Sequence, residues 1–224
     1  MTMLYYPDGS LRGKLLASDE DVGRIRCRAG SWVWFYPAGG VSSLMPVSDE
    51  VIDGAPCRAG SRVYFHENGR LSRCNLPQDG IIKGIPVRSD TFLLFHENGT
   101  LSACRLSEDI LYRDIPCKGG RWIGFYADGR LKRCFISEDT GISGVILRQG
   151  AWAAFHENGA LDNYRLTEDA VVQGVECEAG DILLFDEEGK LTERIKKPLI
   201  PVRDIKKMRG FLKGIDTTVK RENR

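Results

Sequence analysis

The sequence predicts an all-β, elongated repeat protein. Three residue types recur every 30 positions along the 224-residue chain: a glycine, an aromatic residue four positions before it, and an aliphatic residue two positions after it. A fixed period of this length is the signature of repeat architectures, in which each unit buries its apolar side chains mainly against its neighbours. Seven units keep the frame without insertion or deletion, and their glycines are Gly9, Gly39, Gly69, Gly99, Gly129, Gly159 and Gly189.

The first element of each unit is predicted to be a β-hairpin. In the third unit, Val63 and Phe65 alternate with polar or aromatic neighbours, which is the period-two pattern of a strand. Residues 66–69 form a turn, because Asn tolerates a left-handed backbone and glycine adopts positive φ without steric cost. A tight turn between two alternating segments is the strongest short-range signal for a hairpin.

The rest of each unit predicts one further short strand between two turns. A turn rich in Ser, Glu and Asp follows the hairpin, as at residues 107–109, and an apolar segment such as 81–87 leads to a third turn at a glycine. No segment has the periodicity of a helix. Two arrangements keep the apolar columns on one side. Each unit is either one coil of a β-solenoid, or a hairpin whose third segment is a connecting loop.

The charge distribution divides the chain into a repeat domain and a basic C-terminal part. We expect residues 1–193 to form the seven-repeat domain, and residues 194–224 to form a divergent capping half-repeat and tail. Residues 194–224 hold eleven Lys and Arg against three Asp and Glu, whereas the remaining residues hold 21 against 28. Such a tail can bind nucleic acid or an anionic membrane, or dock on the acidic body of its own molecule. Its candidate binding residues are Lys196, Lys197, Arg203, Lys206, Lys207 and Arg209.

The first strands of the hairpins carry aromatic residues on the side opposite the apolar columns. If Val33 and Phe35 point into the core, the residues that alternate with them point outward. Those aromatic residues are Trp32, Trp34, Tyr64, Phe92, Trp122 and Trp152. A contiguous exposed apolar stripe usually marks a partner surface, and Trp and Tyr are enriched in interface hot spots. The pattern predicts a surface for a partner protein or for self-association, or else a face that packs against another part of the chain.

The other chemistry-bearing residues follow the repeat. His66, His96 and His156 share one column with tyrosines, so a role in closing the hairpin turn is favoured over metal binding. The seven cysteines fall into two columns in which sister units have aliphatic residues, which indicates core packing. No nucleophile, phosphate-binding or zinc-protease motif occurs. We therefore expect no catalytic, cofactor-binding or metal-binding residues, and no enzymatic activity.

Composition narrows the class of protein. The chain is 42% hydrophobic and 28% charged, which is an ordinary globular balance. No stretch approaches the ~18 apolar residues of a transmembrane helix, and no secretory signal is visible. The cysteines lack paired spacing, which is typical of reduced thiols in a cytoplasm. The sequence therefore predicts a cytoplasmic protein.

The hairpin turns share the pattern aromatic-x-x-Asn/Asp-Gly-x-Leu, at residues 5–11, 65–71, 95–101, 125–131 and 155–161. This pattern resembles the MORN-repeat variant of YwqK-like bacterial antitoxin-type proteins. The resemblance implies a non-catalytic bacterial scaffold used for protein contacts, such as an antitoxin, an immunity protein or an accessory subunit. The alternative is a nucleic-acid- or membrane-associated accessory protein that acts through the basic tail.

Overall fold

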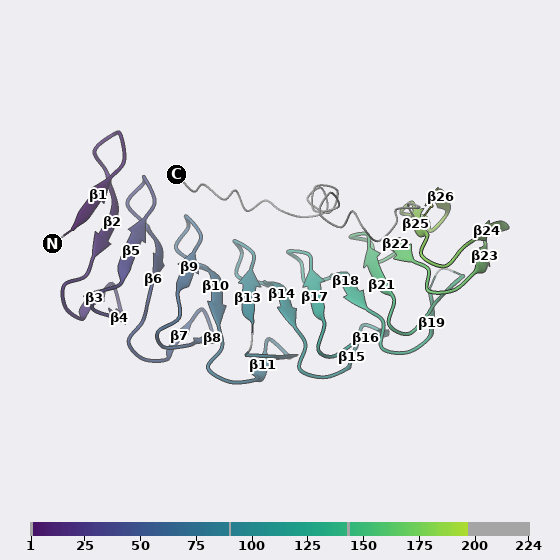
Figure 1. The fold of residues 1–224 in the computed structure, drawn as a ribbon, viewed down its shortest axis with the longest axis horizontal. Coiled ribbons are helices and arrows are strands. Elements are labelled where there is room, and N and C mark those ends of the chain that lie inside the picture. The colour runs from purple at the N-terminus through teal and green to yellow at the C-terminus, as the bar shows by residue number, and fades with distance from the viewer. Residues whose placement is uncertain (1, 90, 143, 197–224) are drawn as a thin grey trace, which may run out of the picture.

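A computed structural model describes residues 2–89, 91–142 and 144–196, in which every regular element is a β-strand (Figure 1). Seven hairpins stand side by side in one long, open sheet, and a smaller hairpin connects each of them to the next. Among these residues no helix is long and apolar enough to cross a membrane. The expected all-β, elongated repeat architecture is confirmed, in the arrangement of stacked hairpins.

The large sheet has 14 antiparallel strands, which lie in the order in which they occur along the chain. Each hairpin pairs with the next, so the sheet is a continuous meander with two strands per unit. Its hairpins are β1 (Met3–Tyr5) with β2 (Leu11–Leu15), β5 (Trp32–Phe35) with β6 (Val41–Leu44), β9 (Val63–Phe65) with β10 (Leu71–Asn75), β13 (Phe92–Phe95) with β14 (Leu101–Arg105), β17 (Trp122–Phe125) with β18 (Leu131–Phe135), β21 (Trp152–Phe155) with β22 (Leu161–Arg165), and β25 (Ile182–Phe185) with β26 (Leu191–Ile195).

The segment between two large hairpins is itself a two-stranded hairpin. These small hairpins are β3 (Glu20–Val22) with β4 (Ile25–Cys27), β7 (Glu50–Ile52) with β8 (Ala55–Cys57), β11 (Gly80–Ile82) with β12 (Ile85–Val87), β15 (Ile110–Tyr112) with β16 (Ile115–Cys117), β19 (Thr140–Ile142) with β20 (Val145–Leu147), and β23 (Ala170–Val172) with β24 (Val175–Cys177). A complete unit therefore has four strands.

Of the two arrangements that the sequence left open, the stacked hairpins form and the solenoid does not. One detail of the sequence prediction is wrong, because the third segment is neither a single strand nor a plain loop. The physical reason is a two-residue turn with positive φ at both positions, such as Asp53 (φ 49°) and Gly54 (φ 81°), which folds the apolar segment back on itself. Two strands per unit in the large sheet keep equivalent residues of all units on the same face.

A β-bulge in the large hairpins sets which side chains face the core. In the third hairpin, Leu71 lies opposite Phe65 while Arg73 lies opposite Tyr64, so one extra residue is accommodated in β10. The bulge lets Leu71 and Cys74, three residues apart, point to the same side, and both are fully buried. Strict alternation would have placed one of them in solvent.

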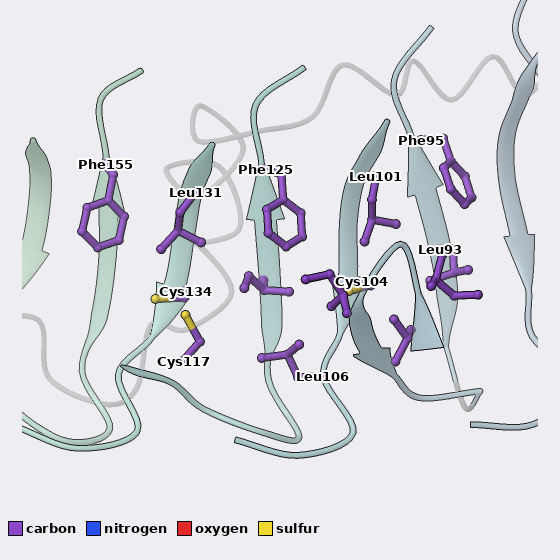
Figure 2. Packing of buried hydrophobic residues seen from close by; sticks show 14 of the residues in the cluster. Leu93, Phe95, Leu101, Cys104, Leu106, Cys117, Phe125, Leu131, Cys134 and Phe155 are labelled. Carbon is purple, nitrogen blue, oxygen red and sulfur yellow. The ribbon is translucent and has the colours of Figure 1, made fainter. Parts of the chain in front are cut away.

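The core lies between one face of the large sheet and the row of small hairpins. Leu93 and Cys104 contribute from the sheet, while Ile85 and Val87 contribute from a small hairpin. Figure 2 shows the buried side chains recurring in the same order from one large hairpin to the next. An isolated bridge from Val87 to Leu106 joins a small hairpin to the large hairpin that follows it. Consecutive units are thus interlocked by burial as well as by strand pairing.

The described chain ends with a strand that departs from the repeat. β26 continues to Ile195, past the expected domain boundary between residues 193 and 194. Arg194 stands where the preceding units have Tyr164 and Cys134, and its guanidinium forms an ion pair with Asp181, which is 1% exposed. In the last described unit, a charged group paired with a buried carboxylate thus takes the place of the apolar residue of the core column. The rest of the expected cap and tail, residues 197–224, lies outside the described residues.

We predict that Gly99→Val destabilises the chain by about 1–3 kcal/mol, because a β-branched residue is strained at positive φ. Gly99 has φ +82°, and an added Cβ would lie 2.8 Å from Arg70 Nη1. Thermal melting measures the effect. The matched control is Gly141→Val, because Gly141 has open space around it and stands where other units have Val51 and Val171. Equal melting temperatures for Gly99→Val and the parent would contradict the turn geometry.

Candidate functional site

One face of the large sheet, which we call the outer face, points away from the small hairpins and carries all six aromatic residues that the sequence predicts to be outward. Two rows of side chains cross its strands. The middle row contains Gly13, Trp34, Ser43, Tyr64, Arg73, Leu94, Ala103, Gly124, Arg133 and Ala154, each directly opposite the next. The base row, nearer the small hairpins, contains Trp32, Asn75, Phe92, Arg105, Trp122, Phe135, Trp152 and Arg165.

Glycines in the middle row let large side chains lie flat on the sheet. A Cβ at Gly13 would lie 2.9 Å from Cε3 of Trp34 and 3.3 Å from Cε3 of Trp32, so both indole rings cover this glycine. A Cβ at Gly124 would lie 3.0 Å from Cγ and from Nε of Arg133. The outer face is therefore a surface on which rings and guanidinium groups rest against backbone.

The structure brings the predicted aromatic residues into two groups. Trp32 and Trp34 stack with ring centroids 5.2 Å apart. Phe92 and Trp122 contact each other with centroids 5.6 Å apart, and together with Trp152 they line a hollow of about 370 Å³. Phe92 and Trp122 are each 38% exposed, while the other predicted residues are half-buried. These side chains therefore form a partly exposed aromatic surface.

Arginines complete the outer face, and the sequence analysis did not predict them. The guanidinium carbon of Arg73 lies 3.8 Å from the ring centroid of Tyr64 and 5.3 Å from that of Phe92, so Arg73 links these two rings by cation–π contacts. Arg12 lies 5.9 Å from the Trp34 ring in the same manner. Arg73 recurs 60 residues later as Arg133. That recurrence was a usable signal, but only knowledge of the bulge places it on this face.

The charge of the outer face differs from that of its borders. The large-sheet strands from β1 to β21 contain no Asp or Glu, and β22 contains one carboxylate, Asp162. The strands β10, β14, β18 and β22 each contribute one arginine. These arginines are Arg73, Arg105, Arg133 and Arg165. Carboxylates lie at both ends of the strands, in the hairpin tips and in the turns that lead to the small hairpins. The outer face is thus a narrow cationic and aromatic band between two acidic borders.

The histidine column has a structural role in the hairpin tips. The Nε2 of His66 lies 2.9 Å from the carbonyl oxygen of Phe95 in the next unit, and the hydroxyl of Tyr126 donates to the carbonyl of Phe155 at 2.8 Å. Because a carbonyl only accepts, Nε2 must carry the proton. Among the described residues no group of three or more His, Cys, Asp or Glu could hold a metal ion.

The acidic turns also have a structural role. The Oδ1 of Asp109 accepts a hydrogen bond from the backbone N–H of Gly119 at 2.6 Å, and the equivalent aspartates of the other units do the same. Hydrogen bonds from Ser89 hold the pKa of Asp79 below its ordinary value. Each carboxylate therefore ties the start of a small hairpin to its end.

The cysteines are all buried and unpaired by disulfides, which confirms the predicted packing role. Figure 2 shows the sulfurs of Cys117 and Cys134 side by side in the core. A sister unit has Val87 and Cys104 at the same two positions, and another has Leu147 and Tyr164. The requirement at these positions is an apolar side chain of suitable size.

No family model matches the chain, and no curated protein is significantly similar to it. The resemblance to the MORN-repeat variant stays a prediction. Of the expected basic-tail residues, Lys196 is exposed at the end of the described chain. The others, from Lys197 to Arg209, lie outside the described residues.

We predict that the core thiols resist alkylation until the chain unfolds. Burial raises the pKa of Cys104 to about 12, from an ordinary value of 9.0, so this thiol stays neutral in the folded chain. The raised pKa contributes stability that is fully present below pH 9 and is lost as the pH rises towards 12.

Iodoacetamide labelling followed by mass spectrometry tests whether the thiols resist alkylation. Urea unfolding between pH 9 and pH 12 tests whether the stability falls as the pH rises. Cys104→Val is the control, because Val87 fills the neighbouring core column and a valine cannot ionise. Its unfolding should lose part of the alkaline pH dependence. Labelling of the folded parent as fast as of the unfolded chain would contradict the prediction.

Proposed function

We propose that this chain is a non-enzymatic β-repeat scaffold that binds another protein through the outer face of its large sheet. The observation that carries the proposal is the group formed by Phe92, Trp122 and Trp152 around an open hollow on a regular sheet. Exposed aromatic residues that surround a depression are characteristic of interface hot spots. Repeat proteins commonly present such extended surfaces to partners.

The construction of the face supports a preformed binding surface. A second hollow of about 510 Å³ lies beside the first and is lined by Phe135, Trp152 and Arg165, among others. A third, of about 620 Å³, lies between Trp34 and Tyr64. All three rest on one hydrogen-bonded sheet, so little conformational entropy is lost when a partner docks.

We propose a non-enzymatic role because the polar side chains that recur in the described repeats already form hydrogen bonds within the chain. The side chains of His66 and Tyr126 bond to the next unit, and Asp109 and its equivalents clamp the turns. A role as an antitoxin, an immunity protein or an accessory subunit of a bacterial, cytoplasmic system stays a prediction. So does nucleic-acid or membrane binding by the basic tail, since nearly all of its residues lie outside the described chain.

We predict that the double change Trp122→Ser and Trp152→Ser weakens partner binding by at least about 2 kcal/mol, roughly 30-fold, because it removes the aromatic rings around the hollow. A photoreactive amino acid at Leu94, in the middle row, reports contact with another protein in cells that produce the chain. The crosslinked product should fall sharply in the double variant.

The control is Val51→Ser with Leu111→Ser, on small hairpins, where these side chains are 75% and 68% exposed. This variant should leave the crosslink unchanged. Thermal melting checks that the tryptophan variant is folded. If it is not, Trp122→Ser alone, at the more exposed ring, replaces it. A folded tryptophan variant with an undiminished crosslink, or no crosslink from Leu94 in the parent, would overturn the proposal.

A further inference from the structure

We infer that the segment bound by the outer face is an extended, carboxylate-rich stretch of the partner protein that runs across the strands. This inference rests on the proposed function and specifies the chemistry of the partner. It follows from the arginines rather than from the aromatic residues. The band they form is positively charged, whereas residues 1–193 as a whole hold 28 Asp and Glu against 21 Lys and Arg.

The arginines form a regular series along the sheet. Arg73, Arg105, Arg133 and Arg165 come from the second strands of four consecutive hairpins, and they alternate between the middle row and the base row. Second strands of neighbouring hairpins are two strand spacings apart, which is about 10 Å. An extended chain in the polyproline II conformation has three residues per turn and rises about 3.1 Å per residue, so carboxylates at every third residue lie on one side at intervals of about 9 Å. The series therefore matches an extended acidic segment.

Two of the four guanidinium groups, those of Arg73 and Arg105, are held in place by contacts within the chain. Arg73 is held against the rings of Tyr64 and Phe92, and the Nε of Arg105 donates to the carbonyl of Gly120 at 2.8 Å. Neither Arg73 nor Arg165 is paired with a carboxylate in the described part of the chain. A planar guanidinium with a fixed orientation binds a carboxylate through two parallel hydrogen bonds, and its prior ordering lowers the entropic cost.

The same contacts favour carboxylates over the bases and phosphates of a nucleic acid. Base stacking needs a free aromatic face. Arg73 lies over the ring of Tyr64, Trp32 and Trp34 stack on each other, and Arg121 lies 5.1 Å from the ring of Phe135, so each of these rings already has one face in contact. Phe92 and Trp122, each 38% exposed, are the rings that a base could still reach. The acidic borders on both sides of the band also repel a polyanion that is wider than the band. The hollows between the arginines can hold apolar side chains, so apolar residues lie between successive carboxylates of the segment.

The test uses a fluorescein-labelled synthetic peptide of repeated Asp-Leu-Gly units and measures fluorescence anisotropy with the full chain. We expect saturable binding that weakens as salt is added. The double change Arg73→Gln and Arg133→Gln should weaken it at least about tenfold. The matched control is Arg24→Gln with Arg113→Gln, two exposed arginines in small-hairpin turns, and it should bind like the parent.

Three results would each overturn the inference: no binding of the peptide, equal binding when Asn replaces every Asp in it, or equal binding by the Arg73→Gln and Arg133→Gln variant. Tighter binding of an oligothymidylate than of the peptide would also overturn it, in favour of a nucleic acid. The crosslink from Leu94 distinguishes failure of the acidic-segment inference from failure of the proposed protein binding. If the crosslink survives in the Arg73→Gln and Arg133→Gln variant and the peptide does not displace it, the acidic segment is rejected. Protein binding through the outer face is then still supported.

Discussion

The outer face depends on one constraint, the fixed register in which each hairpin pairs with the next. A slip of one residue would turn the core columns towards solvent and scatter both outer rows. At the hairpin tips, side chains such as His66 hold the register through a hydrogen bond to a carbonyl in the next unit. At the other end, a bridge such as that between Val87 and Leu106 holds it. Each hydrogen bond contributes only about 1 kcal/mol, but it is repeated in unit after unit.

Much of this arrangement could be predicted from the sequence, because the 30-residue period puts residues of the same kind at the same place in every unit. The tight turns and the alternation of Val63 and Phe65 predict the large hairpins and the outward tryptophans. The small hairpins could not be predicted from turn chemistry alone, since Lys83 adopts φ 50° without being a residue that favours it. The arginines could not be placed either, because the bulge after Leu71 reverses the alternation by one residue.

The two faces of the large sheet have different physical requirements. The inner face tolerates Cys, Val, Leu or Tyr at equivalent positions as long as the volume is filled, as Cys104 and Tyr164 illustrate. The outer face instead combines the largest side chains with the smallest, because Trp34 needs Gly13 and Arg133 needs Gly124. The units are therefore alike in the core and individual on the outer face. This division lets the fold stay constant while the outer face carries a different order of charged and aromatic side chains in each unit.

The even number of strands that each unit adds to the large sheet has a consequence for how such a chain can change in length. Duplication or deletion of one whole unit shifts everything beyond it by about 10 Å along the sheet and leaves every side chain on its original face. If each unit added an odd number of strands, equivalent side chains would switch between the core and the outer face from one unit to the next. The length of the outer face can therefore change by whole units without a change in which side chains it presents. In the last unit of the described chain, Arg194 is charged at a position where the preceding units are apolar.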